Sequence, residues 1–193
     1  VMIAYGGIMT KFGDEIKELW KLQTNMIFLN HGSYGATPTE VLEVQSQWRL
    51  QLETQPCQFV NKIEPREIRA AAGSLAKFLG ANGVDLVFVE NTTSGINAIL
   101  RSFPFQKDDE VVVSDHIYNA VRKTLDFVLE ARGARLVIAK LGLPVTGDDA
   151  IVEAIFAEVT SSTRLILIDH VASATAVKFP VARIAKIASA QDI

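Results

Sequence analysis

The feature that most constrains the fold is an alternation of apolar runs with segments of helical spacing in the second half of the chain. Apolar runs, each predicted to form a strand, occupy residues 86–89, 110–113, 136–139 and 164–168. Predicted helices follow them at about 94–101, 119–131, 149–158 and 181–190. Continuous apolar strands separated by helices are typical of a parallel sheet that is covered on both faces. The sequence therefore predicts an α/β fold with three α/β/α layers around a mainly parallel sheet.

The chain before these runs predicts mainly helices. A short amphipathic helix is expected over 14–23, then an extended stretch at 26–29 and a turn-rich loop at 30–35. A longer helix is predicted to start around Pro38, with Thr37 as its cap and Glu40 completing a capping box.

That longer helix is expected to end at Pro56, and another is predicted over 65–79, closed by Gly80 and Gly83. The apolar residues of this second helix are expected to face inward: Ile68, Ala72, Leu75, Phe78 and Leu79. We place the boundary between the helical part and the sheet domain near residues 61–65. The expected domains are 1–63, an N-terminal helical segment of the small domain and interface, and 64–193, an incomplete large domain.

Composition excludes several classes of partner. The 193 residues include 19 basic and 22 acidic side chains, so no basic surplus favours nucleic acid or an anionic membrane. No run approaches the roughly 20 apolar residues of a membrane span. Cys57 is the single cysteine, which allows no intrachain disulfide and makes a thiolate zinc site unexpected. We therefore expect a cytoplasmic protein that binds no metal.

The first eight residues are apolar but lack the basic segment of a signal peptide. Two interpretations stay open: Met9 is the natural start of the protein, or the chain begins at Val1 with a frayed tail.

Three predicted strands end in unusual polar loops. The loop after the first run, residues 90–97, reads ENTTSGIN and opens a helix. A helix N-terminus presents free backbone N–H groups and a partial positive charge, so hydroxyls and a glycine there suit a phosphate. The alternative is that Thr93 or Ser94 only caps the helix. The loop is neither a P-loop nor a dinucleotide fingerprint.

The second loop, residues 114–119, reads SDHIYN, and the third, residues 169–175, reads DHVASAT. Tyr118 at a strand end is able to stack on a planar ring, and Asp169 beside His170 suits acid–base work or support of a cofactor. The alternatives are a capping role for Asp115 or Asp169 and simple packing for the others; a hydrolase triad is less favoured because no nucleophile elbow is present. Because ligands bind beyond the carboxyl ends of parallel strands, the loops together predict a site for a phosphate-bearing aromatic cofactor.

These loops resemble the class V aminotransferase family of pyridoxal 5'-phosphate (PLP) enzymes, in its isopenicillin N epimerase-like branch. The resemblance rests on four stretches in matching order and spacing, from residue 28 to the end of the chain. They are FLNHGSYGATP at 28–38, VENTTSGIN at 89–97, DHIYNAV at 115–121 and IDHVASAT at 168–175.

The resemblance implies PLP as the cofactor and the fold type I large domain as the fold. It implies that Thr92, Thr93 and Ser94 hold the phosphate and that Tyr118 stacks on the pyridine ring. Ser173 would lie near the 3-hydroxyl, with Asp169 and His170 supporting the site. Asn30 and His31 would line the substrate side.

The resemblance also implies what these 193 residues lack. The family's pyridinium aspartate and Schiff-base lysine come after the last helix predicted here. Lys178 and Lys186 are interpreted as solvated surface charges. We therefore expect an N-terminal half that is inactive alone, because the lysine moves protons at the substrate and the aspartate keeps the ring protonated. An uncovered sheet edge is expected beside the last strand.

The expected function is that of a PLP-dependent enzyme acting on an amino acid, as an epimerase or aminotransferase and as a homodimer. One alternative is a carbon–sulfur lyase or cysteine desulfurase-like enzyme. Another is a non-catalytic remnant that binds a phosphate ligand or a partner. A doubly wound hydrolase or nucleotide binder is disfavoured, because the sequence has neither a nucleophile elbow nor a glycine fingerprint.

Overall fold

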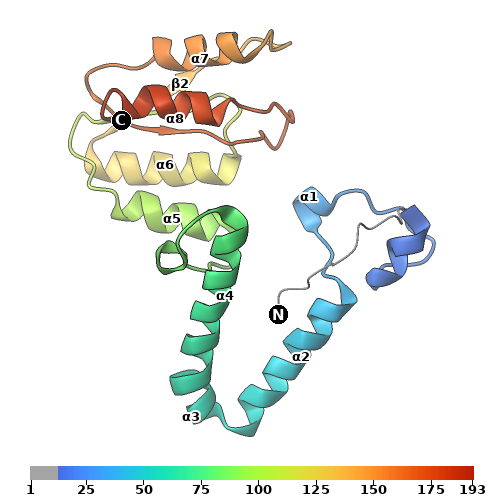
Figure 1. Ribbon diagram of the computed structural model, residues 1–193. Coiled ribbons are helices and arrows are strands. Elements are labelled where there is room, and N and C mark those ends of the chain that lie inside the picture. The colour runs from blue at the N-terminus through green and yellow to red at the C-terminus, as the bar shows by residue number, and fades with distance from the viewer. Residues whose placement is uncertain (1–12) are drawn as a thin grey trace. The chain divides into compact units, whose positions relative to one another are not determined.

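A computed structural model describes residues 13–193 (Figure 1). The choice between Val1 and Met9 as the start lies outside the described residues. The chain separates into two compact units, Val1–Phe88 (unit 1) and Val89–Ile193 (unit 2). This division is one of compactness. The predicted division between residues 63 and 64 separates a small-domain and interface segment from a cofactor-binding domain, and it stays a prediction.

Unit 1 is helical throughout its regular elements. The described elements are η1 (Gly13–Leu19), α1 (His31–Tyr34), α2 (Thr39–Thr54), α3 (Pro56–Gln58), η2 (Phe59–Ile63), α4 (Glu64–Leu79) and η3 (Gly83–Asp85). The two long helices, α2 and α4, correspond to the predicted ones. The helix expected over 14–23 is instead a shorter 3₁₀ helix, and the predicted turn loop contains the single helical turn α1.

Two predictions about the ends of these helices have different outcomes. Thr37 does not cap α2: Pro38 holds the cap position, without any side-chain capping bond. The chain is fixed there by Trp20 instead, whose indole N–H donates to the Ala36 carbonyl at 3.1 Å. Gly80 does close α4, with a positive φ of 67° that favours glycine.

The apolar face predicted for α4 is mostly exposed, which corrects the sequence interpretation. Ala72 is buried, but Leu75 and Phe78 are 38% and 86% exposed. The reason is that α4 packs through small residues: a Cβ added to Gly83 would lie 2.8 Å from the Gly73 Cα. That close approach of two backbones buries alanine and leaves the larger side chains outside.

Unit 2 is built on a parallel three-stranded sheet in the order β2-β1-β3 (Figure 1). Its strands are β1 (Glu110–Ser114), β2 (Arg135–Ala139) and β3 (Thr163–Leu167). Its helices are α5 (Thr92–Ser102), α6 (Asn119–Arg132), α7 (Asp148–Ala157) and α8 (Val181–Ser189). The predicted alternation of strands and helices is confirmed from residue 92 onward.

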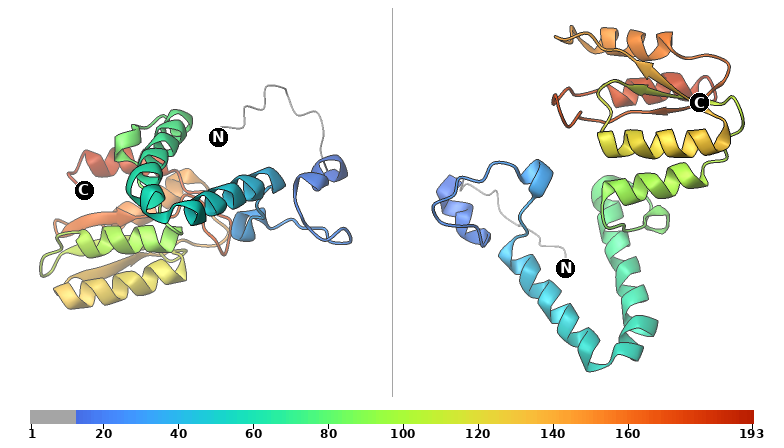
Figure 2. Two further views of the ribbon diagram at one scale, coloured as in Figure 1. Left: turned by 90° about the horizontal axis from the view of Figure 1, so that it is seen from below. Right: turned by 180° about the vertical axis from the view of Figure 1, so that it is seen from behind.

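The central strand divides two cores. Val111 and Val113 face a core shared with α5 and α6, whereas Val112 faces a core shared with α7 and α8. All three valines are fully buried. Successive strand residues point to opposite faces, so this alternation places one helix pair on each side (Figure 2). The predicted three-layer α/β/α arrangement is confirmed.

The first predicted strand, at residues 86–89, does not form. This run pairs with no strand in the described chain, and Val87 and Phe88 are 77% and 49% exposed. An apolar, branched run fits a pleated surface, but it becomes a strand only where a partner supplies hydrogen bonds. Among residues 13–193, β3 pairs with β1 on one side and with no strand on the other, which agrees with the expected uncovered edge.

Within residues 13–193, no helix is both long enough and apolar enough to span a lipid bilayer.

Candidate functional site

The start of α5 leaves anion-binding groups free. Asn91 caps the helix, its side-chain oxygen accepting from the Ser94 backbone N–H at 2.9 Å. Capping by Thr93 or Ser94, the alternative interpretation, is therefore wrong. Among the described residues, no hydrogen bond involves the hydroxyls of Thr92, Thr93 and Ser94 or the backbone N–H groups of Thr92 and Thr93. Three hydroxyls and two N–H groups at a helix N-terminus form a suitable phosphate cradle.

Helices α5 and α6 place this cradle and Tyr118 at the same rim of the sheet. The Asn97 side chain donates to the Thr124 hydroxyl at 3.0 Å. Asn97 lies five positions after the start of α5, and Thr124 lies five positions after the start of α6. The two helices thus lie side by side with their N-termini at the same rim of the sheet (Figure 2). Because α6 follows β1 directly, that rim is the carboxyl end of the strands.

Tyr118 immediately precedes α6 and is 47% exposed, so its ring is available to a ligand. Its backbone N–H donates to the Asp169 carboxylate at 3.1 Å. Asp115 does not cap α6 as the alternative interpretation held. Its carboxylate accepts from the Leu141 backbone N–H at 3.1 Å and so links the loops after β1 and β2.

The loop after β3 carries Ser173, Asp169 and His170 at the same rim, beside the end of β1. Ser173 and His170 are exposed and Asp169 is partly buried. The loop is folded back on itself, since the Phe179 N–H donates to the His170 carbonyl at 2.9 Å. The structure therefore gathers the predicted phosphate, ring and support residues of unit 2 along one rim; their roles toward a cofactor stay predictions.

Sequence reasoning missed His116. Its imidazole is only 5% exposed and its Nδ1 lies 2.7 Å from the Thr175 hydroxyl. The signal that could have found it is a histidine two positions after a buried strand end, in the same loop as Tyr118. The Asp115 carboxylate lies 3.7 Å from the His116 Nε2, which is too long for a hydrogen bond. Asp115, His116 and Thr175 therefore do not form a hydrogen-bonded hydrolase triad.

The substrate-side candidates lie in unit 1 and have local partners. The Asn30 side chain accepts from the Ser33 N–H at 3.3 Å and caps α1. The His31 Nδ1 accepts from the Ala36 N–H at 3.4 Å, and its ring meets the Phe28 ring edge-on at 4.7 Å. Both residues are exposed. These contacts order the loop, and the substrate role stays a prediction.

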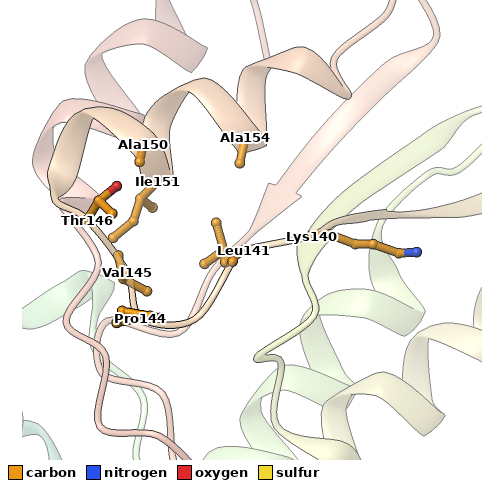
Figure 3. Close-up of a pocket in the computed structure, with 9 residues that line it drawn as sticks. Lys140, Leu141, Pro144, Val145, Thr146, Ala150, Ile151 and Ala154 are labelled. Carbon is orange, nitrogen blue, oxygen red and sulfur yellow. The ribbon is translucent and has the colours of Figure 1, made fainter.

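A separate hollow of about 140 Å³ lies after the end of β2 and beside α7 (Figure 3). Its lining is mostly apolar, including Leu141, Val145 and Ile151, and Lys140 extends away from the other lining residues. None of the predicted site residues lines it. Over the described part of the chain, no three His, Cys, Asp or Glu side chains gather as a metal site.

Comparisons with known proteins show which family and which fold the chain resembles. A family model described as Aminotransferase class-V matches residues 33–193. The hercynylcysteine sulfoxide lyase of Schizosaccharomyces pombe is 24% identical, over 94% of this chain and 46% of that protein. The isopenicillin N epimerase of Streptomyces clavuligerus is 27% identical, over 93% and 45%. A solved C-DES mutant with glycine covalently linked to its PLP cofactor has a TM-score of 0.78 at 18% identity, covering 86% of this chain and 44% of that one.

The chain spans about half the length of the curated relatives that it matches. The likeness to the solved structure is one of fold, and it confirms the predicted fold type I architecture of PLP-dependent enzymes.

Proposed function

Because the chain belongs to the class V aminotransferase family, a family of PLP-dependent enzymes, we propose that unit 2 carries cofactor-binding residues for PLP. The observation that supports this most directly is the set of unpaired hydroxyl and N–H groups at the start of α5, level with the exposed Tyr118. One end of PLP is a phosphate and the other an aromatic ring, which matches a cradle and an aromatic side chain on one rim.

In this proposal Thr92, Thr93 and Ser94 donate hydrogen bonds to the phosphate, and the helix N-terminus adds a favourable partial charge. The Tyr118 ring stacks on the pyridine ring.

Ser173 would lie near the 3-hydroxyl of the bound cofactor, with Asp169 and His170 supporting the loop. The cofactor, when bound, supplies an electron sink for reactions at an amino-acid α-carbon. The residues of this chain bind and orient it.

The proposed substrate is an amino acid, with Asn30 and His31 on the substrate side, and the proposed reaction is epimerisation or transamination. A carbon–sulfur lyase is the second candidate. It is favoured by the named relatives, which include a hercynylcysteine sulfoxide lyase and an L-cysteine desulfhydrase of Arabidopsis thaliana that is 26% identical. Comparing pyruvate release from cysteine with epimerisation or transamination of amino acids in a full-length enzyme separates the two candidates.

We propose that no lysine among these 193 residues forms the Schiff base and that the chain alone does not turn over substrate. Lys178 and Lys186 are exposed, on the loop after β3 and on α8. The family resemblance implies that both the lysine and the pyridinium aspartate come after α8, so these residues carry the proposed cofactor-binding and substrate-side groups without the proposed proton-transfer groups. The alternative is that the 193 residues function alone, as a non-catalytic remnant that binds a phosphate ligand.

We also propose a homodimer in the cytoplasm. The large apolar side chains exposed in unit 1 support the dimer, since a large exposed apolar patch marks an interaction surface. The free, exposed Cys57 agrees with a reducing compartment. Sedimentation equilibrium tests the dimer, and a mass that stays at 21.1 kDa over a wide range of concentrations would contradict it.

The experiment that tests the proposed function uses two ligands on the same chain. Pyridoxine 5'-phosphate has no aldehyde, so calorimetry with it measures the cradle and ring contacts alone; we expect one site per chain. PLP followed by borohydride reduction and intact mass measures Schiff-base formation, and we expect no stoichiometric adduct at a single lysine. Absence of pyridoxine 5'-phosphate binding would refute the cradle, and one specific lysine adduct would refute the half-enzyme interpretation.

A further inference from the structure

His116 is a buried polar side chain with one close partner from a distant part of the chain. Its imidazole is 5% exposed and forms a T-shaped contact with the Phe179 ring, the ring centroids 6.3 Å apart. A buried polar group costs free energy unless it is hydrogen-bonded. The 2.7 Å contact from its Nδ1 to the Thr175 hydroxyl meets that need across 59 positions of sequence. This contact therefore joins the loop after β1 to the loop after β3.

The loop that carries Thr175 is itself well fixed. The Ala172 N–H donates to the Val177 carbonyl and the Ala176 N–H donates to the Ala172 carbonyl, both at 2.9 Å. Val171 also forms an isolated antiparallel bridge with Lys178. Thr175 is thus a firm anchor for His116, although its own side chain is at the surface.

A second contact joins the same two loops. The Asp169 carboxylate accepts from the Tyr118 N–H at 3.1 Å, two residues beyond His116. The segment 116–118 is consequently held at both of its ends by the loop that carries Ser173. The two residues proposed to contact the PLP ring, Tyr118 and Ser173, each lie two positions from one member of the His116–Thr175 pair.

We propose that His116, through Thr175, is a positioning residue that fixes the Tyr118 ring relative to Ser173. This inference rests on the proposed function of unit 2. His116 does not touch the cofactor in this account. His116 fixes the distance between Tyr118 and Ser173, the two residues proposed to contact the cofactor ring. The phosphate cradle at the start of α5 does not depend on His116.

Four variants test the proposal on the 193-residue chain. Thr175→Val keeps the shape of an exposed side chain and removes the hydroxyl, and His116→Ala removes the imidazole. Thr175→Ser keeps the hydroxyl, and His116→Asn keeps a polar atom near the position of Nδ1. The probes are pyridoxine 5'-phosphate, which has both phosphate and ring, and inorganic phosphate, which has only the former. Calorimetry and amide chemical shifts at residues 92–95 give the two affinities.

Loss of one net hydrogen bond is worth about 1 kcal/mol, so we expect affinity for pyridoxine 5'-phosphate to fall roughly five- to tenfold in Thr175→Val and His116→Ala. Affinity for inorganic phosphate is expected to stay unchanged, and the Ser and Asn variants are expected to bind as the unaltered chain does. Equal affinity of Thr175→Val and the unaltered chain for the ring ligand overturns the positioning role. Loss of both ligands in every variant also overturns it, because that result indicates general disruption.

The unaltered chain separates failure of this inference from failure of the proposed function. If it binds neither probe, the proposed PLP site fails and the positioning role fails with it. In that case the nitrogen chemical shifts of the His116 imidazole, compared between the unaltered chain and Thr175→Val, still report whether the hydrogen bond exists. If the unaltered chain binds both probes, the variants alone decide.

Discussion

Unit 2 buries a core of large apolar side chains between its sheet and its helices, whereas in the described part of unit 1 no large apolar side chain is buried. Leu125 and Ile155 of unit 2 are completely buried, but Leu29 and Phe78 of unit 1 are 87% and 86% exposed. In the described part of unit 1, the hydrophobic residues classed as buried are two alanines of α4. Unit 2 therefore has a hydrophobic core of its own. The helices of unit 1 instead leave apolar side chains exposed, as expected of a surface that binds another protein surface.

Hydrogen exchange should show the largest difference between the two units. The amides of β1 lie in the fully buried central strand, so they are expected to exchange only through global opening. Amides in the middle of α2 are expected to exchange at least about a thousandfold faster, since no residue of that helix is buried. Mass spectrometry of peptides from each element measures this. Equal protection of α2 and β1 would contradict the contrast.

A pair of core and surface substitutions sharpens the same contrast. Leu125→Ala creates a cavity beside β1 and is expected to lower the free energy of unfolding of unit 2 by about 2–5 kcal/mol. Phe78→Ala, its match in unit 1, is expected to change the free energy of unfolding of unit 1 by less than about 0.5 kcal/mol. Urea unfolding followed by circular dichroism gives both values. A large loss in Phe78→Ala would show that unit 1 buries this ring after all.

Cofactor binding is expected to depend on unit 2. Replacing Thr92 and Thr93 together by valine removes two hydroxyls that face a charged phosphate, so we expect a roughly tenfold to hundredfold loss of affinity for pyridoxine 5'-phosphate. Thr146→Val is the matched control, because Thr146 lies at the hollow beside α7 on the other side of the sheet.

His31→Ala in unit 1 is expected to leave this affinity unchanged, since His31 is proposed to face the substrate. Calorimetry measures all the variants. A loss of affinity in the Thr146 control equal to that in the double variant would indicate that the cradle lies elsewhere.

The smallest expected effect concerns two glycines in the same backbone conformation. Gly80 of unit 1 and Gly133 of unit 2 both have φ of 67° at the end of a helix. Alanine at Gly133 is expected to lower the free energy of unfolding of unit 2 by about 1–2 kcal/mol, and its Cβ would also meet the Lys107 side chain at 3.4 Å. Alanine at Gly80 is expected to fray only the end of α4. Circular dichroism during thermal unfolding distinguishes the two, and equal shifts in midpoint would count against independent units.

The same contrast explains which features the sequence could predict. In unit 2, periodicity and burial agree, so the helices at 92–102 and 119–132 were predicted to within about two residues. In unit 1, the spacing of Ile68, Leu75 and Phe78 correctly indicated a helix, but not that its apolar face is exposed. The run at 86–89 has strand-like composition, but pairing depends on a partner strand that composition does not specify.

The site shows a similar limit. The loop at 90–97 was predicted because hydroxyls, a glycine and a helix start lie together in the sequence. Which residue caps the helix depends on geometry, and Asn91 holds that position instead of Thr93 or Ser94. The contact between His116 and Thr175 spans 59 positions, so it follows from the order of the strands and not from any local pattern.

The most direct test of the account is an NMR titration of the chain with pyridoxine 5'-phosphate, with amide resonances assigned in both units. We predict saturable shifts at Thr92, Thr93 and Ser94 and around Tyr118 and Ser173, with residues of α2 unaffected. That result would establish a phosphate and ring site on the rim of unit 2. Shifts confined to exposed lysines, or to unit 1, would contradict the central claim that unit 2 holds the cofactor.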